Sequence, residues 1–243
     1  MPSDRSNTVL LTRADEPLAR ELAARGAEVV TVPCVRREPA DRAALLDALT
    51  ALGTADLLVL TSPAGVEAIG AVTDARAVPC AIAVVGPVTA GRLRALGREP
   101  EFVASVATGA AFGAELPLPR GAVLLARSDR ALDELPATLR ARGALIREVV
   151  AYRSRPGADG DVGVARAAVE AGATVVFASP SAVEGFAADI CAELPVDHRV
   201  VAIGPTTAAA AVRLFDVSPL TALEPTARAI ADLALEGSHV ARH

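Results

Sequence analysis

A short pattern occurs twice in the chain, each time as an apolar run that ends in Ser-Pro and continues into Ala, Val and Glu. The first copy covers residues 56–67 and the second covers residues 174–184. Such a run predicts a buried parallel strand, a tight turn and a helix start, because serine caps helix N-termini and proline fits their first turn. The two serines, Ser62 and Ser179, are 117 positions apart.

Other segments repeat at nearly the same interval. Residues 84–90 match 202–208, residues 9–15 match 123–129, and residues 25–27 match 142–144. A period this long is one domain's worth of chain, so it predicts two similar domains rather than a solenoid.

Composition limits the kinds of protein this can be. With 243 residues, 52% of them hydrophobic, the chain can bury two cores of about 120 residues each. No apolar run approaches the roughly 20 residues that span a bilayer, and the N-terminus lacks an apolar signal core, so no membrane partner is expected. Three scattered cysteines, Cys34, Cys80 and Cys191, indicate a reducing compartment, the cytoplasm.

Several chemistries are excluded by the charged residues. Lysine is absent and all 24 basic residues are arginine, which excludes a Schiff-base lysine and a Walker lysine. The net charge of −5 and the 2% aromatic content disfavour nucleic acid as a partner. The three histidines (198, 239 and 243) have no metal-ligand spacing, so no metal site is expected.

Apolar periodicity predicts strands that alternate with helices. The expected strands are 9–12, 28–32, 57–60, 81–85, 123–125, 147–152, 175–178 and 200–203. The expected helices are 16–25, 43–52, 66–72, 89–96, 110–116, 132–142, 162–171, 182–194, 207–215 and 226–236. Two polar segments that end in proline, 35–39 and 153–156, are expected to be connectors. This alternation predicts an α/β protein with two parallel sheets, each covered by helices on both faces.

The repeated motifs follow the predicted strands, where ligands bind in sheets of this kind. They place hydroxyls, helix N-terminal N–H groups and the paired arginines Arg13 and Arg127 at the carboxyl ends of the strands. Helix N-termini and arginine forks bind anions. The alternative is that the serines and threonines only cap helices and that the arginines are solvated surface charges.

The ordered series of motifs resembles the uroporphyrinogen-III synthase family along nearly the whole chain. The series runs Thr-Arg (12–13), Thr-Ser-Pro-x-x-Val-Glu (61–67), Val-Gly-Pro-x-Thr-Ala (85–90), Val-Val-x-Tyr-Arg (149–153), Ser-Pro-Ser-x-Val (179–183) and Ile-Gly-Pro-Thr-Thr-Ala (203–208). No single motif is specific, since Gly-Pro and Ser-Pro turns are common, but the order and spacing are.

The resemblance implies two flavodoxin-like domains that are not split at the repeat boundary. Residues 1–36 with 152–243 would form a discontinuous first domain, and residues 37–151 the second. The two connectors would then be a pair of strands crossing between the domains, forming a hinge that lets a cleft open and close.

The resemblance also implies an activity. The family cyclises hydroxymethylbilane, a linear tetrapyrrole with eight carboxylates, to uroporphyrinogen III, with loss of water and inversion of the last pyrrole ring, D, through a spiro intermediate. Closure without enzyme gives the uninverted isomer, so the enzyme mainly selects one conformer. No cofactor or metal is implied. We expect a monomer, with transient hand-over of substrate from hydroxymethylbilane synthase.

Tyr152, the only tyrosine, matches the tyrosine singled out in the family. Our hypothesis is that its hydroxyl donates a hydrogen bond to the departing hydroxyl of the substrate; the alternative is an aromatic that packs at the hinge. The expected substrate-binding residues are Arg13, Thr61, Ser62, Gly86, Thr89, Arg127, Ser128, Ser179, Ser181, Gly204, Thr206 and Thr207. The sequence leaves open whether Thr206 or Thr207 faces the substrate.

Two other functions stay open at this point. A non-catalytic ligand-binding or regulatory protein could keep the same two-domain fold. An unrelated two-domain sugar or nucleotide transferase is disfavoured, because no Gly-rich phosphate loop occurs in the sequence.

Overall fold

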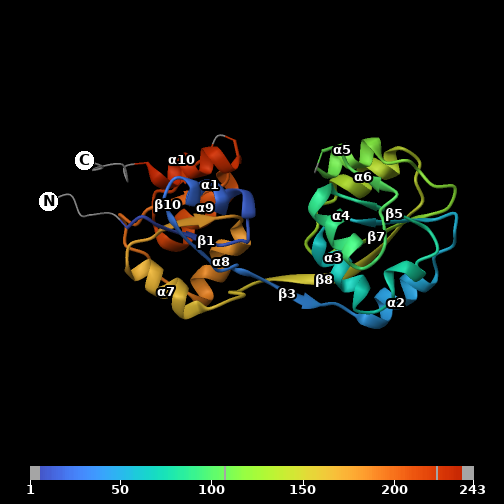
Figure 1. The fold of residues 1–243 in the computed structure, drawn as a ribbon, viewed down its shortest axis with the longest axis horizontal. Coiled ribbons are helices and arrows are strands. Elements are labelled where there is room, and N and C mark those ends of the chain that lie inside the picture. Colours follow the sequence, from blue (N-terminus) through green and yellow to red (C-terminus); the bar gives the residue numbers. More distant parts are fainter. Residues whose placement is uncertain (1–5, 107, 223, 237–243) are drawn as a thin grey trace. The chain divides into compact units, whose positions relative to one another are not determined.

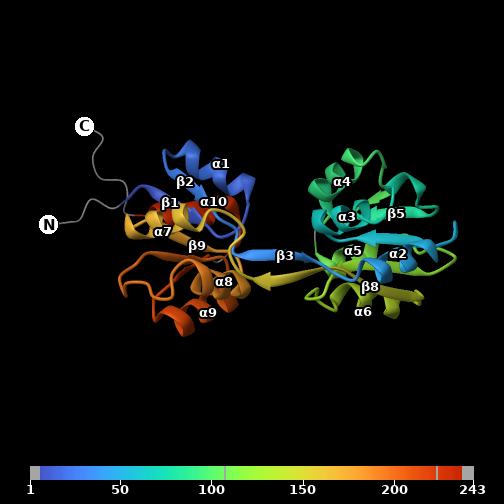
Figure 2. The ribbon, with the colours of Figure 1, turned by 90° about the horizontal axis from the view of Figure 1, so that it is seen from below.

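The computed structural model describes residues 6–106, 108–222 and 224–236, which divide into two compact units (Figure 1). Unit 1 contains the residues up to Arg36 and from Arg155 onward, and unit 2 contains Arg37–Ser154. The chain passes between the units twice, within β3 (Val35–Pro39) and within β8 (Ile146–Pro156). These two segments are strands next to each other in one sheet, which Figure 2 shows, so the two polar connectors are paired strands, as the family resemblance implies.

Unit 1 is built on a five-stranded sheet in the order β11-β10-β9-β1-β2. The strands are β1 (Thr8–Leu11), β2 (Glu28–Thr31), β9 (Thr174–Phe177), β10 (Val200–Ala202) and β11 (Leu220–Thr221). The paired strands run parallel, with Leu10 opposite Val30 on one side and Val175 on the other. Helices α1 (Glu16–Ala24) and α10 (Ala227–Leu235) cover one face, and α7 (Val162–Glu170), α8 (Pro180–Asp189) and α9 (Pro205–Phe215) cover the other.

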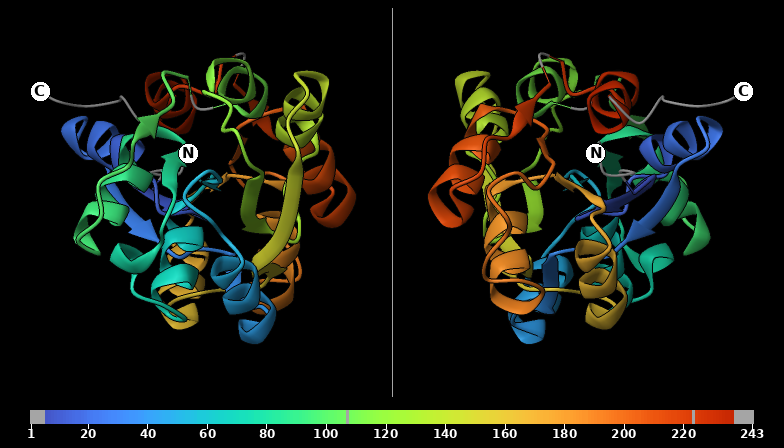
Figure 3. Two further views of the ribbon diagram at one scale, coloured as in Figure 1. Left: turned by 90° about the vertical axis from the view of Figure 1, so that its right-hand side faces the viewer. Right: turned by 90° about the vertical axis from the view of Figure 1, so that its left-hand side faces the viewer.

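Unit 2 repeats this plan in the order β3-β8-β7-β4-β5-β6. Its remaining strands are β4 (Leu57–Leu60), β5 (Ala81–Val84), β6 (Phe102–Val103) and β7 (Val123–Ser128). Helices α2 (Arg42–Thr50), α3 (Pro63–Gly70) and α4 (Gly86–Ala95) pack on one face, and α5 (Gly109–Glu115) and α6 (Glu134–Ala141) pack on the other. A 3₁₀ turn, η1 (Ala75–Ala77), precedes β5. The end-on views in Figure 3 show helices on both faces of the sheets.

The strand order explains the sequence repeat. If β4 is matched with β9 through the two Ser-Pro turns, then β5 matches β10, β6 matches β11, β7 matches β1 and β8 matches β2, and the two sheets have the same order. The central strands β4 and β9 are buried at every position, as their continuous apolar runs predict for parallel sheets covered on both faces. The prediction of two similar parallel α/β units is therefore confirmed.

Asp56 fastens the start of β4 to the start of β7. Its carboxylate accepts hydrogen bonds from the backbone N–H groups of Ala122 (2.7 Å) and Gly53 (2.8 Å) and from the Arg147 guanidinium (3.0 Å). The backbone donors lower the pKa of Asp56 from its ordinary value of 3.8, and Arg147 adds to the effect. A lowered native-state pKa means that this carboxylate stabilises the fold above its unfolded-state pKa and stops doing so as the pH falls through its folded-state value.

We therefore expect Asp56→Asn to lower the free energy of unfolding at pH 7, because the neutral amide cannot accept all of these bonds. The gap from wild type should narrow as the pH falls below about 4, where the wild-type carboxyl becomes protonated first in the unfolded chain and, at lower pH, in the folded protein. Urea unfolding between pH 3 and pH 7 measures this gap. Asp47→Asn, at an exposed position of α2, is the control, and a gap that is the same at every pH would contradict the prediction.

Candidate active site

Most of the predicted site residues lie near the carboxyl ends of the strands. In each sheet there is one point where the direction in which successive strands are added reverses. In unit 2 the reversal falls between β4 and β7, and in unit 1 it falls between β9 and β1. A pocket of about 200 Å³ lies at the unit 2 position. It is lined by Thr61, Val85 and Arg127 together with the start of α5 and residues 131, 132, 134 and 135. A much smaller pocket in unit 1 is lined by the matching residues Ala178, Ile203 and Arg13. Both lie where parallel sheets typically bind ligands.

Both repeated serines cap helices, as predicted. The Ser62 hydroxyl accepts a hydrogen bond from the Gly65 N–H (3.2 Å) at the start of α3, and the Ser179 hydroxyl accepts one from the Ala182 N–H (3.1 Å) at the start of α8. In each helix proline occupies the first turn. These contacts establish the capping role, and they place both hydroxyls at helix N-termini, which favour negative charge.

Tyr152 lies within β8, opposite Ser128 at the end of β7, and its hydroxyl is 2.9 Å from the Ser62 hydroxyl. Its ring is half-buried and packs against the core beneath α2, α3 and α4. The ring also lines a second pocket of unit 2, of about 220 Å³, together with alanines of α3 and residues 37–42. The tyrosine therefore has an apolar support for its ring and a polar partner for its hydroxyl.

The threonines differ in exposure. Thr89 in α4 is 3% exposed and Thr207 in α9 is 2% exposed, and the repeat matches these two positions. Thr206 is exposed on the first turn of α9. Of the adjacent pair, Thr206 is thus the residue accessible from solvent.

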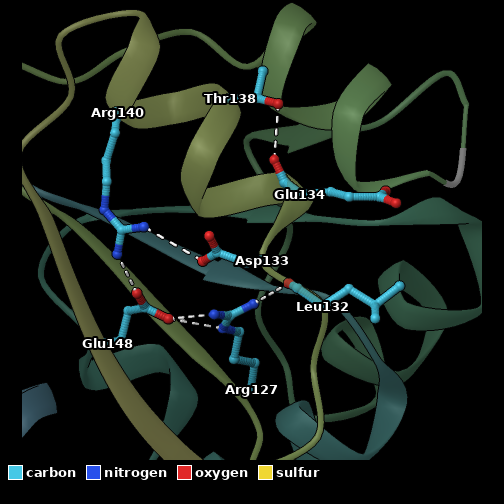
Figure 4. A network of polar contacts seen from close by, with 7 residues as sticks. All are labelled: Arg127, Leu132, Asp133, Glu134, Thr138, Arg140 and Glu148. Carbon is cyan, nitrogen blue, oxygen red and sulfur yellow. Dashed lines mark hydrogen bonds and ion pairs between the residues drawn. The ribbon is translucent and has the colours of Figure 1, made fainter.

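Arg127 belongs to a network that Figure 4 shows at the end of β7. Its guanidinium donates to the Glu148 carboxylate, with one contact from Nε at 3.0 Å, and to the carbonyl of Leu132 at 2.6 Å. Glu148 also pairs with Arg140 at 2.6 Å, and Arg140 lies 3.4 Å from Asp133. Three of the five guanidinium N–H groups of Arg127 are used in this way. The other two have no partner among the residues that the structure describes, and the side chain is only 12% exposed.

Arg13 in unit 1 is held less firmly. It pairs at 2.7 Å with Asp15, the cap of α1, and its side chain is 54% exposed. Just before it, the buried Thr12 hydroxyl donates to the Val176 carbonyl (2.8 Å) and accepts from the Ala178 N–H (3.1 Å), which joins the ends of β1 and β9. Arg13 therefore follows a fixed backbone position, and its guanidinium is partly exposed to solvent.

The remaining predicted site residues are two serines and two glycines at or near helix starts and strand ends. The Ser128 hydroxyl lies 3.0 Å from that of Ser154, and Ser181 lies in the first turn of α8. Gly86 begins α4 at φ 73°, a backbone conformation that favours glycine, and Gly204 caps α9 in extended conformation. Gly86 is therefore required by its backbone geometry, whereas Gly204 is not.

The described part of the chain was compared with the requirements of a metal site and of a membrane-spanning helix. No three His, Cys, Asp or Glu side chains there could hold a metal ion, and none of its helices is long and apolar enough to cross a membrane. The Cys34 thiol is buried, and that burial raises its pKa to about 12, so it stays protonated at neutral pH.

Two residues that help to build the candidate site were not predicted from the sequence. Glu148, which holds Arg127, has no motif around it, and its role depends on the register between β7 and β8. Thr12 had a signal, because it precedes Arg13 in the repeated strand end, but its hydroxyl contacts join segments more than 160 residues apart.

Comparison with known proteins shows the family of the chain. The model of the family described as "Uroporphyrinogen-III synthase HemD" matches residues 16–232. The chain belongs to the uroporphyrinogen-III synthase family. A relative named uroporphyrinogen-III synthase, from Synechococcus elongatus, is 33% identical over 160 residues, which is 61% of this chain and 61% of that relative's length.

Solved structures of the same name share the fold. A structure of uroporphyrinogen-III synthetase from Helicobacter pylori matches with a TM-score of 0.60 at 15% identity, over 95% of this chain and 98% of that one. A mutant uroporphyrinogen III synthase from Thermus thermophilus matches with a TM-score of 0.52 at 20% identity, over 88% and 91%. At these identities the likeness concerns the fold, which agrees with the two parallel α/β units described above.

Proposed function

We propose that this protein is a uroporphyrinogen-III synthase, which cyclises hydroxymethylbilane to uroporphyrinogen III with loss of water and inversion of ring D. The observation that carries the proposal is the family match over residues 16–232. The strand-end hydroxyls, helix N-termini and arginines add support, because they suit a substrate with eight carboxylates.

In the proposed reaction the terminal hydroxyl leaves with its bonding electron pair and takes up one proton to become water. The electron-rich pyrrole nitrogen stabilises the cation left on carbon. The cationic carbon then bonds to the ring D carbon that already carries the chain, which gives the spiro intermediate. The original bond between that carbon and the chain breaks, and the freed chain carbon bonds to the unsubstituted carbon of ring D, which releases one proton. Ring D is thereby inverted, and the protein gains no proton overall. Tyr152 is the proposed hydrogen-bond donor to the leaving oxygen, since its hydroxyl lies at a strand end beside a helix N-terminus.

Substrate carboxylates are proposed to bind the strand-end residues of the two units. In unit 1 these are Arg13, Ser179, Ser181, Gly204, Thr206 and Thr207, and in unit 2 they are Thr61, Gly86, Thr89, Arg127 and Ser128. A cytoplasmic location is proposed, because Cys34, Cys80 and Cys191 are scattered along the sequence, which suits a reducing compartment. The proposed working form is a monomer that receives substrate from hydroxymethylbilane synthase.

The test is to supply freshly prepared hydroxymethylbilane and to separate the III and I isomers after oxidation to the porphyrins. We expect the III isomer to predominate with the protein and the I isomer to predominate in buffer and with heat-denatured protein. An isomer ratio equal to that in buffer would refute the proposal and leave a binding role.

A further inference from the structure

The Ser62 hydroxyl has two partners in unit 2. It accepts the capping bond from the Gly65 N–H at 3.2 Å and lies 2.9 Å from the Tyr152 hydroxyl. A hydroxyl has one hydrogen to donate and two lone pairs. After accepting from Gly65 it can still either accept from Tyr152 or donate to it. The contact can therefore reverse its direction without any movement of heavy atoms.

The matching serine of unit 1 shows that capping does not require a tyrosine. Ser179 caps α8 through the Ala182 N–H at 3.1 Å. The position that matches Tyr152 at the same 117-residue interval is Val35, which has no hydroxyl. The same helix start is thus built with and without the tyrosine contact, so the contact is an addition to the cap in unit 2.

We propose that Ser62 is a positioning residue that directs the Tyr152 hydroxyl and supports its donation to the leaving group; this inference rests on the proposed function. When Tyr152 donates its hydrogen to the substrate oxygen, Ser62 turns its own hydrogen to the Tyr152 oxygen. Negative charge that develops on that oxygen is then shared along a chain from Tyr152 through Ser62 to the Gly65 N–H. Chains of hydrogen bonds strengthen one another, and the N-terminus of α3 favours negative charge.

This role differs from binding a substrate carboxylate, the role expected for Ser62 from the sequence. One acceptor site of the hydroxyl is used by Gly65, and its free hydrogen points to Tyr152 during donation. The structure therefore assigns Ser62 to the chemical step rather than to substrate affinity. An effect on kcat with little change in KM is the signature that separates these roles.

The experiment compares Ser62→Ala, Ser62→Gly and Ser62→Thr, each in the wild-type and Tyr152→Phe backgrounds. Glycine is an acceptable N-cap, so Ser62→Gly removes the hydroxyl with little loss of helix stability, and threonine restores the hydroxyl. In the wild-type background we expect Ala and Gly to lower kcat for the III isomer about tenfold, the value of one hydrogen bond, with KM within about twofold. Ser62→Thr should retain most of the activity. In the Tyr152→Phe background none of the three should lower kcat further.

Thr226→Ala is the matched control, because it removes a hydroxyl cap with the same geometry, to the Ala229 N–H at 3.2 Å at the start of α10. It should leave kcat unchanged, and the thermal midpoint of every variant confirms folding. Equal losses of kcat in both backgrounds, or a change in KM alone, would overturn the inference while leaving the proposed function intact. A wild-type protein that yields only the I isomer would instead refute the proposed function.

Discussion

Tyr152→Phe is expected to lower the turnover number for uroporphyrinogen III about 100-fold, the scale of a lost proton donor. The ring keeps its contacts with the core of unit 2, and only the hydroxyl bonded to Ser62 is removed. The free energy of unfolding should therefore fall by only about 1 kcal/mol. Steady-state formation of the III isomer and urea unfolding measure the two effects on the same protein.

The matched control for this prediction is Thr50→Val, which removes an exposed hydroxyl of α2 that donates to the Leu46 carbonyl at 2.8 Å. Turnover should be unchanged in this variant. If Tyr152→Phe retained full turnover, the tyrosine would be a packing residue and the leaving oxygen would have another donor.

Gly185→Ala is expected to destabilise unit 1 by about 3 kcal/mol or more, the upper range for overpacking a core. Gly185 is buried in α8, and a Cβ there would overlap the carbonyl oxygen of Cys34 and the backbone nitrogen of Gly157. These two atoms are hydrogen-bonded to each other at 3.1 Å. Backbone cannot rotate away as a side chain can, so either the helix or this bond must move.

Gly91→Ala in α4 supplies the opposite control. Nothing lies within 4 Å of a Cβ at Gly91, and alanine is favoured over glycine in a helix interior by about 0.5–1 kcal/mol. This variant should be slightly more stable than wild type in urea unfolding. A Gly185→Ala protein as stable as wild type would show that α8 does not pack on these backbone segments.

Local signals predicted the helix starts and the buried strands. The Ser-Pro turns were predicted because capping involves only residues within three positions of the serine. Long apolar runs predicted β4 and β9 because strands of a covered parallel sheet are buried on both faces. The two-residue edge strands β6 and β11 and the turn η1 were not predicted, since two or three residues show no periodicity.

Apolar periodicity gave a wrong helix end where buried residues continue beyond the helix. A helix was expected over 182–194, but α8 ends at Asp189. Ile190 and Leu194 are buried in the same core although they lie beyond the helix. The carboxylate of Asp189 accepts from the Ala158 N–H at 2.8 Å and pairs with Arg36. Helix starts were also misplaced. Helix α4 begins at Gly86, three residues before the expected start, with Pro87 in its first turn.

The polar partners at the candidate site could not be predicted. The contact between Ser62 and Tyr152 joins residues 90 positions apart and depends on the order β4-β7-β8. The ion pair between Arg127 and Glu148 depends on the register that sets Arg127 opposite Val150. A sequence pattern indicates which residues reach a strand end, but side-chain pairing across a sheet follows only from the assembled strands.

The position of β1 also has a consequence for synthesis on the ribosome. β1 and β2 belong to the same sheet as β9, yet about 140 residues separate Thr31 from Thr174. At about 5–20 residues per second, the apolar N-terminal strands emerge roughly 7 to 30 s before their partners. The strands of unit 2, from β4 to β8, emerge in one uninterrupted stretch and can fold meanwhile. Until β9 emerges, β1 therefore lacks its second partner strand in the sheet.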